Sequence, residues 1–372
     1  MNTKVVRWLP AAVIPSVIVV AALAAPAVAD DTPDLEPKTA QELLELVASS
    51  ETTAFSGTVE QTSDLGLPEL PMGAGGDSST GASAAIELLT SDHTVRVFVG
   101  GDDTSRVQVM DTLAQRDVIR NGSEVWFYDS EANEATKVTV PEKSATPEAS
   151  PYESLTPAQM AQSFLEKVDP STEITVGDTA RVAGRDAYTL TLSPDTSETL
   201  IGSVVLTVDA ETGMPLATSV TARDQASPAF SVAFSSIDFT APDASLFEFT
   251  PPAGATVTEK TEADLPEHSE ADATVPGDHP RPTVVGADWA SILILPAEMG
   301  AAGEMGAPGD APSGSSPEGA DATALLEQMT TAVPEGRILS TSLVTILLAN
   351  DGRVLVGAVS AEQLQTAAQT AQ

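Results

Sequence analysis

Residues 187–209 read AYTLTLSPDTSETLIGSVVLTVD, and this stretch decides the fold. Large apolar side chains recur at every second position, first at Tyr188, Leu190 and Leu192 and then at Leu206 and Val208. Most positions between them are Thr, Ser or Asp. Because successive side chains of a strand point to opposite faces, this period of two predicts two antiparallel strands with one buried face and one hydrated face.

The same alternation extends on both sides of this stretch. It is present in AFSVAFS at 229–235, HTVRVFV at 93–99 and SRVQVMD at 105–111. EVWFYD at 124–129 follows VIR and the pair Asn121-Gly122, which predicts a tight hairpin. Further strands are expected at 54–61 and 136–140, and DAETG at 209–213 predicts a turn.

Two helices are expected beside these strands. In residues 39–50, TAQELLELVASS, four apolar side chains fall on one side of a helix and Thr39 is a suitable N-cap. In residues 157–168, PAQMAQSFLEKV, Pro157 suits the first turn and Thr156 suits the cap. We therefore predict an α+β, mainly β fold over 38–255, in which one strongly curved antiparallel sheet forms a half-open barrel with helices on its concave face.

The rest of the chain divides into a linker, an insert and a small module. Residues 256–282 and 297–321 are acidic, rich in Gly and Pro and poor in large apolar side chains, which predicts an acidic linker and a flexible insert. Residues 283–296 resemble a strand pair. Residues 322–372 predict a helix at 322–331, strands at 338–349 and 353–359, and a final helix from Ser360. About fifty residues make a marginal core, so 283–296 and 322–372 are expected to pack together as a C-terminal α/β module.

The N-terminal residues 1–29 have the layout of a secretory signal peptide. Lys4 and Arg7 precede an apolar run at 11–25, and Ala27-Val28-Ala29 offers a small-x-small cleavage site. The apolar run is shorter than a typical membrane span, so we expect cleavage, with retention as a membrane anchor as the alternative. Either outcome predicts an extracytoplasmic location.

Composition excludes several classes of function. The formal net charge of -37 repels nucleic acid, so no nucleic-acid partner is expected. The chain has no cysteine, which removes disulfides, thiolate metal sites and a lipid-modified N-terminal cysteine. The histidines His93, His268 and His279 are scattered, and no sequence motif of a nucleophile, phosphate loop or zinc site is present. No catalytic residue, metal or cofactor is predicted, and the chain is not expected to be an enzyme.

Five segments, in order, resemble the LolA family of lipoprotein carriers and the related N-terminal domain of the RseB/MucB regulators. They are AFSGTVEQ at 54–61, VIRNGSEVWFYDSEANEATKV at 118–138, VAGRDAYTLTLSPD at 182–195, VLTVDAETGMPLATSV at 205–220 and FEFTPPAGATV at 247–257. The resemblance covers 38–258. In its tail, TVVGADW and LLANDGRVLVGAV make the chain similar to actinobacterial exported members of the family.

The resemblance implies a half-open barrel whose apolar concave side binds the acyl chains of a lipid or lipoprotein. The apolar strand positions are the candidate site, against the alternative that they are ordinary core: Val95, Val107, Val109, Tyr188, Leu190, Leu206, Val208, Phe230, Val232 and Phe234. A second candidate is a lid or docking loop, against the alternative that it folds back over the sheet edge: Leu65, Leu67, Leu70 and Met72.

Three functions fit the sequence. The first is an envelope carrier that shields acyl chains of a lipid or lipoprotein. The second is an RseB-like envelope signalling protein or sigma-factor regulator that binds a membrane protein partner. The third is a structural envelope protein whose barrel is filled by its own side chains.

Overall fold

The computed structural model describes residues 33–50, 54–66, 91–110, 114–140, 171–261, 282–297 and 329–370. The alternating segments pair into a sheet of 13 strands, here called the large sheet. Its strands are β1 (Phe55–Ser63), β2 (His93–Gly101), β3 (Thr104–Met110), β4 (Gln115–Asn121), β5 (Glu124–Asp129), β6 (Glu134–Thr139), β7 (Thr172–Val176), β8 (Ala180–Val182), β9 (Arg185–Pro194), β10 (Ile201–Asp209), β11 (Pro215–Ala222), β12 (Phe230–Asp238) and β13 (Thr256–Thr261).

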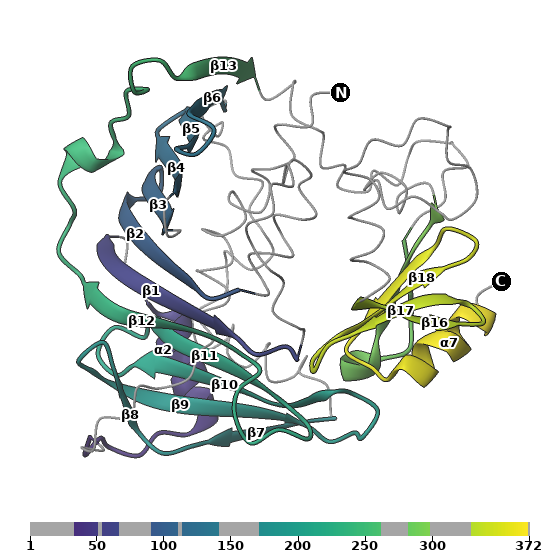
Figure 1. Ribbon diagram of the computed structural model, residues 1–372. Helices are drawn as coiled ribbons and strands as arrows, with labels where there is room; N and C mark the ends of the chain where they lie inside the picture. Colours follow the sequence, from purple (N-terminus) through teal and green to yellow (C-terminus); the bar gives the residue numbers. More distant parts are fainter. Residues whose placement is uncertain are drawn as a thin grey trace, which may run out of the picture.

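The large sheet is open and curved. Its strand order is β13-β6-β5-β4-β3-β2-β1-β12-β11-β10-β9-β7, with β8 also paired to β9. It bends from β13 at the top through β1 to β7 at the bottom and does not close into a barrel (Figure 1). The mainly β prediction is confirmed. The sheet is mixed, because β13 runs parallel to β6.

β13 corrects the predicted start of the linker. Residues 256–261, assigned to the acidic linker, pair in register with β6 from Thr256 opposite Glu134 to Thr261 opposite Thr139. Its sequence, TVTEKT, has one large apolar side chain, Val257, which is exposed. An edge strand held by its backbone ladder needs no apolar alternation, so the pattern did not reveal it. The rest of the predicted linker, 262–281, lies outside the described residues.

The first predicted helix is present as α2 (Ala40–Ala48). Thr39 caps it in a capping box, in which the Thr39 hydroxyl accepts from the Glu42 backbone N–H and the Glu42 carboxylate accepts from the Thr39 backbone N–H. Leu43 is fully buried and packs with Tyr188 and Leu190 of β9. The second predicted helix, 157–168, and the predicted signal peptide lie outside the described residues.

Both predicted turns of the large sheet form, one of them shifted by a residue. Asn121 pairs with Glu124, so the two-residue loop is Gly122-Ser123 and not Asn121-Gly122. Gly122 has φ +60 and provides the left-handed first position of this loop. In the 209–213 turn, Asp209 accepts hydrogen bonds from the Thr212 backbone N–H and hydroxyl. Gly213, at φ +73, closes that turn against the end of α2.

The C-terminal module forms a second sheet of six strands, here called the small sheet. Its order is β14-β15-β19-β18-β17-β16, and α7 (Ala361–Thr370) packs on one face. The strands are β14 (Thr283–Val285), β15 (Ile292–Leu295), β16 (Thr331–Val333), β17 (Gly336–Ser340), β18 (Thr345–Ala349) and β19 (Val354–Gly357). The expected pairing of 283–296 with the C-terminal strands occurs between β15 and β19.

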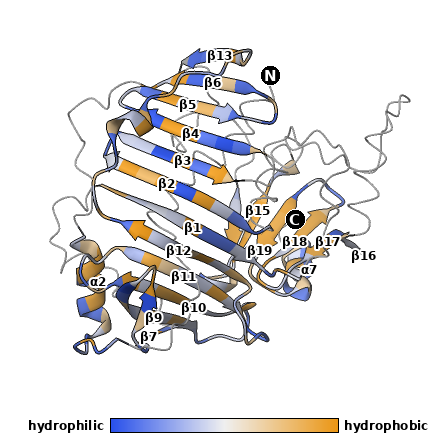
Figure 2. Cartoon of the chain, turned by 60° about the vertical axis from the view of Figure 1, so that its left-hand side comes forward, coloured by the Kyte–Doolittle hydropathy of each residue, from blue (hydrophilic) through white to orange (hydrophobic). Residues whose placement is uncertain are grey.

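Two predictions for this module are wrong in detail. The predicted strand 338–349 is two strands, because residues 341–344 form a turn between β17 and β18. The predicted helix 322–331 cannot reach its expected end, because Thr331 already belongs to β16. The strands of the small sheet are apolar along most of their length, whereas those of the large sheet alternate (Figure 2). The small-sheet face opposite α7 includes the exposed side chains Val284 and Leu293.

The small sheet is attached to one end of the large-sheet strands. Ser342, in the β17–β18 turn, donates its backbone N–H to the Leu65 carbonyl at 2.9 Å. The Ala358 carbonyl accepts from the Leu200 backbone N–H and the Thr199 hydroxyl, both at 2.8 Å. These contacts lie where β1 ends and β10 begins, so the module covers that end of the sheet.

Candidate functional site

Strand register places one continuous apolar surface on the large sheet. Residues that pair directly across neighbouring antiparallel strands point to the same face. Leu190 pairs with Leu206, which pairs with Thr218, and Thr218 pairs with Val232. Val59 of β1 pairs with Phe234 of β12 on one side and with Val95 of β2 on the other. Val95 in turn pairs with Val109 of β3. We call this surface the apolar face.

All ten predicted positions lie on the apolar face. Val107 joins it through its pairing with Val97, and Tyr188 and Val208 join it by pairing with each other. Phe230 shares the face with Val232 and Phe234, two and four residues further along the same strand. Register also adds residues that were not among the predicted site positions: Phe55, Val59, Val97, Val118 and Phe127. The alternation of apolar side chains within each strand indicates which of them share a face of that strand. Only the pairing with neighbouring strands shows which of these faces lie on the same side of the sheet.

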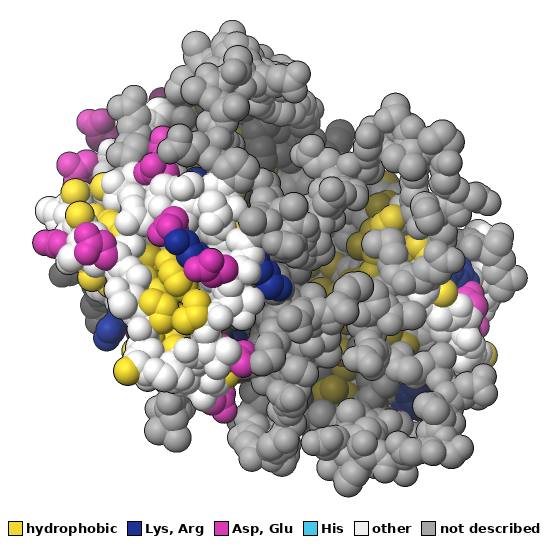
Figure 3. All heavy atoms as spheres, turned by 90° about the horizontal axis from the view of Figure 1, so that it is seen from above, with side chains coloured by type: hydrophobic (Ala, Val, Ile, Leu, Met, Phe, Trp, Pro, Cys, Tyr) yellow, Lys and Arg dark blue, Asp and Glu magenta, His cyan; other side chains and the backbone are white. Residues whose placement is uncertain are grey.

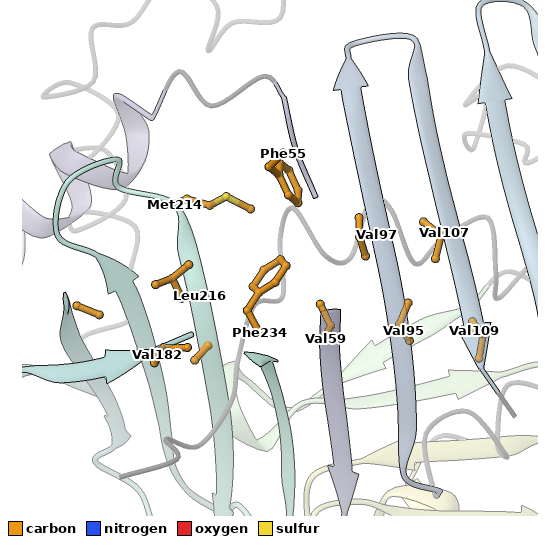
Figure 4. Close-up of a cluster of buried hydrophobic side chains, with 12 residues drawn as sticks. Phe55, Val59, Val95, Val97, Val107, Val109, Val182, Met214, Leu216 and Phe234 are labelled. Atoms are coloured by element: carbon orange, nitrogen blue, oxygen red, sulfur yellow. The ribbon is translucent and has the colours of Figure 1, made fainter. Parts of the chain in front are cut away.

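The middle of the apolar face is buried. Val107 is 2% exposed, and it belongs to one cluster with Phe55, Val59 and Phe234. The Phe55 and Phe234 rings pack edge to face with their centroids 6.1 Å apart. Figure 4 shows these side chains on β1 and β12 directed toward one another, with the valines of β2 and β3 beside them. Aliphatic and aromatic carbon therefore makes up this part of the face.

One end of the apolar face serves as helix packing. Tyr188 and Leu190 form a cluster with Leu43 of α2, and Leu206 packs against that cluster. The Tyr188 hydroxyl donates to the Glu36 carbonyl at 2.9 Å, which fixes the chain leading into α2. These three predicted site residues are therefore core beneath a helix in this structure.

Polar side chains border the apolar face on another side. Val109 pairs with Arg116 of β4, and Arg116 pairs with Asp129 of β5. The buried Asp129 carboxylate accepts from the backbone N–H groups of Glu131 and Ala132, so it shapes the β5–β6 turn. His93, also buried, pairs with Gln61 at the corresponding end of β1 and β2. The apolar surface thus ends in charged and hydrogen-bonding groups at this border.

The opposite face of β3 to β6 carries a structural network. Arg106 forms an ion pair with the buried Asp117 at 2.8 Å and donates to the Leu246 carbonyl. Phe249 packs against Trp126 and Tyr128, with ring centroids 5.3 and 5.4 Å away. These contacts of Arg106 and Phe249 anchor the segment after β12 to the sheet. Seen from above, apolar side chains on the large sheet, at the left, lie beside Lys or Arg and Asp or Glu side chains (Figure 3).

The buried Asp209 is the strongest electrostatic feature of the β9–β11 region. Arg185 donates to its carboxylate from two nitrogens, and one of these also reaches Glu211. Burial alone would raise the pKa of Asp209, but hydrogen bonds from Arg185 and Thr212 outweigh it and hold the pKa below its usual value. The hydrogen bond to Asp209 raises the pKa of Arg185. Both groups stay charged, which is the state of a structural ion pair.

The predicted lid divides at the limit of the described residues. Leu65 packs against the cluster of Ala222, Ala229 and Leu343, so it folds back over the end of the sheet. The other predicted lid residues, Leu67, Leu70 and Met72, lie outside the described residues.

In the described part of the chain, no group of three or more His, Asp or Glu side chains is placed to hold a metal ion. Within the same residues, no helix has the length and hydropathy needed to cross a membrane.

Comparison with known proteins supports the resemblance. Residues 86–253 match the family model of the MucB/RseB N-terminal domain. No curated protein matches the sequence. Similar solved structures include the MucA/MucB complex of Pseudomonas aeruginosa, with 14% identity, a TM-score of 0.40 and coverage of 88% of this chain and 96% of that chain. They also include a LolA superfamily protein from Nitrosomonas europaea, with 10% identity, a TM-score of 0.22 and coverage of 57% and 99%.

The matched residues include β2 to β12 of the large sheet and contain three of the five motifs, at 118–138, 182–195 and 205–220. The motif at 247–257 lies partly inside the match, and the motif at 54–61 precedes it. Residues 86–253 of this chain are therefore similar to the MucB/RseB N-terminal domain.

Proposed function

We propose that this protein is a carrier of the cell envelope that binds the acyl chains of a lipid or lipoprotein on the apolar face. The observation that carries the proposal is the strand register, which collects apolar side chains from eight strands, β1 to β5, β9, β10 and β12, on one face. Among the described residues, no further strand pairs with the edge strands β13 and β7. Its function is binding, without catalysis.

The chemistry of the face fits an acyl chain. Its middle offers valine and phenylalanine carbon, which provides dispersion contacts and excludes water but makes no hydrogen bonds. Burial of each methylene of a guest contributes roughly 0.8 kcal/mol, so a chain of ordinary length can bind through burial alone. The polar border at Arg116 and Asp129 lies where a guest would reach its polar end.

The sequence supports action outside the cytoplasm. Residues 1–29 have the layout of an export signal, and the family of the matching model is defined by MucB and RseB. With no cysteine in the chain, anchoring through a lipidated cysteine is excluded. We therefore place the carrier at the outer side of the cytoplasmic membrane or in the medium, released if the signal is cleaved and anchored if it is retained.

A second function is a regulator in which lipid occupancy controls binding to a membrane protein. The match to the MucB/RseB model favours it, as does the attached small sheet, for which a simple carrier has no evident use. A carrier binds and releases its load alone. A regulator shows an affinity for its protein partner that changes with bound lipid.

Native mass spectrometry of protein purified gently from its own host, with lipid extraction in parallel, tests the proposal. We expect about one acylated species per chain. The double variant V97T/V107T exchanges methyl groups for hydroxyls at two directly paired positions, and we expect it to lower acyl binding at least about tenfold.

The matched control is V359T, which makes the same exchange at a buried position of the small sheet. It should retain the lipid, and thermal unfolding should confirm that all variants fold. A wild-type protein that purifies empty and takes up no acyl lipid from host extracts would refute the carrier and regulator readings together.

A further inference from the structure

Leu343 of the small sheet completes the apolar face of the large sheet. It is 8% exposed and forms a cluster with Ala222 and Ala229, against which Phe230 and Val220 pack. Val220 pairs with Phe230 across β11 and β12, and Phe230 lies on the apolar face. Leu343 therefore sits at the end of that face, although it belongs to the other sheet.

The turn that carries Leu343 is fixed by its own hydrogen bonds. The Thr341 backbone N–H donates to the Val344 carbonyl at 2.9 Å, and the Thr341 side-chain oxygen accepts from the backbone N–H groups of Leu343 and Val344. Such side-chain to backbone bonds set the turn locally. The backbone at Leu343 is thus fixed within the turn.

The turn is also fixed to the large sheet. Ser342 donates its backbone N–H to Leu65, two residues past the end of β1, and its hydroxyl donates to the Asp64 carbonyl at 3.3 Å. A third attachment lies near the start of β7, where the Trp289 indole N–H donates to the Thr172 hydroxyl at 2.7 Å. These bonds fix the backbone of the turn relative to the large sheet, so Leu343 projects from an anchored turn.

We infer that Leu343 is the stop that limits the length of an acyl chain lying on the apolar face. Phe230, Val232 and Phe234 follow one another along β12, and Phe230 and Phe234 are about 13 Å apart along a strand. A chain that runs along them toward the small sheet meets Leu343 after Phe230. The residue would thereby determine specificity for chain length. This inference rests on the proposed function.

The test is binding of saturated fatty acids of graded length, from 12 to about 20 carbons, by displacement of a fluorescent fatty acid from the full chain. For wild type we expect affinity to rise with length and then to stop rising. In L343A the plateau should move to longer chains, with roughly a fourfold gain in affinity for each methylene newly buried. In L343F the plateau should move to shorter chains.

Leu293→Ala is the matched control, because it truncates a leucine of the small sheet that lies outside the Leu343 cluster. It should leave the length profile unchanged, and thermal unfolding shows whether each variant is folded. A wild type that binds fatty acids with a profile that neither L343A nor L343F moves overturns the stop while leaving the carrier intact. A wild type that binds no fatty acid of any length overturns the carrier, and the stop with it.

Discussion

The backbone N–H of Ser342 donates to the carbonyl of Leu65 at 2.9 Å, which joins the β17–β18 turn of the small sheet to the chain leaving β1. Leu65 is also the first residue of the predicted lid, and it packs against Leu343 from that same turn. The loop that leaves the apolar face therefore starts from a contact between the two sheets.

Replacing Leu343 with Asp should detach the small sheet from the large one. The substitution puts a carboxylate among aliphatic side chains, which we expect to cost about 2–3 kcal/mol of docking free energy. Hydrogen exchange at the Leu200 and Ser342 amides, which bond across the interface, should accelerate by roughly 30- to 150-fold. Amides of β18 should keep their protection. The control S342A removes only a 3.3 Å hydroxyl bond and should leave all these rates within about threefold.

Asp209 should make stability depend on pH in the acid range. Its pKa is lower in the folded chain than the ordinary value of 3.8, so below 3.8 the unfolded chain takes up a proton first. Stability is then fully present above that value and is lost as pH falls toward the lower folded pKa. Urea unfolding between pH 2.5 and 7 should show this loss, and D209N should reduce it.

D209N should also lower the free energy of unfolding at pH 7 by about 2–3 kcal/mol, because the exchange breaks a pair whose Asp side chain is 1% exposed. The comparison variant is D186N. Its pair, Arg181–Asp186, has side chains 38% and 42% exposed, so the loss should stay below about 1 kcal/mol. Equal losses of unfolding free energy in D209N and D186N would show that burial of Asp209 does not strengthen its ion pair.

Gly213→Ala should cost more than about 2 kcal/mol. Gly213 has φ +73, and an added Cβ would lie 2.2 Å from the Leu46 carbonyl oxygen of α2. Gly122→Ala separates the effect of the positive φ from that of the steric clash, because Gly122 has φ +60 but open space around it. This substitution should cost roughly 1 kcal/mol. Chemical denaturation measures both, and the idea fails if the two glycines tolerate alanine equally.

Thr39→Ala should destabilise the protein by about 1 kcal/mol, since it removes the side chain that caps the Glu42 backbone N–H. T39S keeps the hydroxyl and should restore most of the loss. Thermal unfolding gives the overall change, and faster exchange of the first α2 amides would locate it. An unchanged melting temperature in T39A would mean that packing of Leu43 alone holds the helix.

Much of the fold could be predicted from local pattern. The alternation of Leu190 and Leu206 identified β9 and β10, and the cap at Thr39 identified the start of α2. Both patterns can be recognised in the sequence because each depends only on residues within four positions of one another. Four strands were missed for the same reason. β7, β8 and β16 are too short to show a period, and β13 is a polar edge strand.

The candidate site was predictable only in part. The predicted residues of each strand share one face of that strand, and Tyr188, Leu190 and Leu206 lie in the core beneath α2. The additional residues Phe55 and Val97 follow from pairing, and Leu343 follows from docking of the second sheet. No local pattern could have indicated that Leu343 meets Phe230, because the turn at 341–344 looked like the middle of a strand.

The sequence by itself determined which side chains share a face within each strand, because a strand has a period of two and burial of one face selects that pattern. Only the tertiary structure decided which strands are neighbours, that β1 lies between β2 and β12, and where the apolar face ends. The physical reason is that strand order depends on pairing between segments far apart in the chain. Its free energy comes from burial of the whole sheet, and no short segment contains that information.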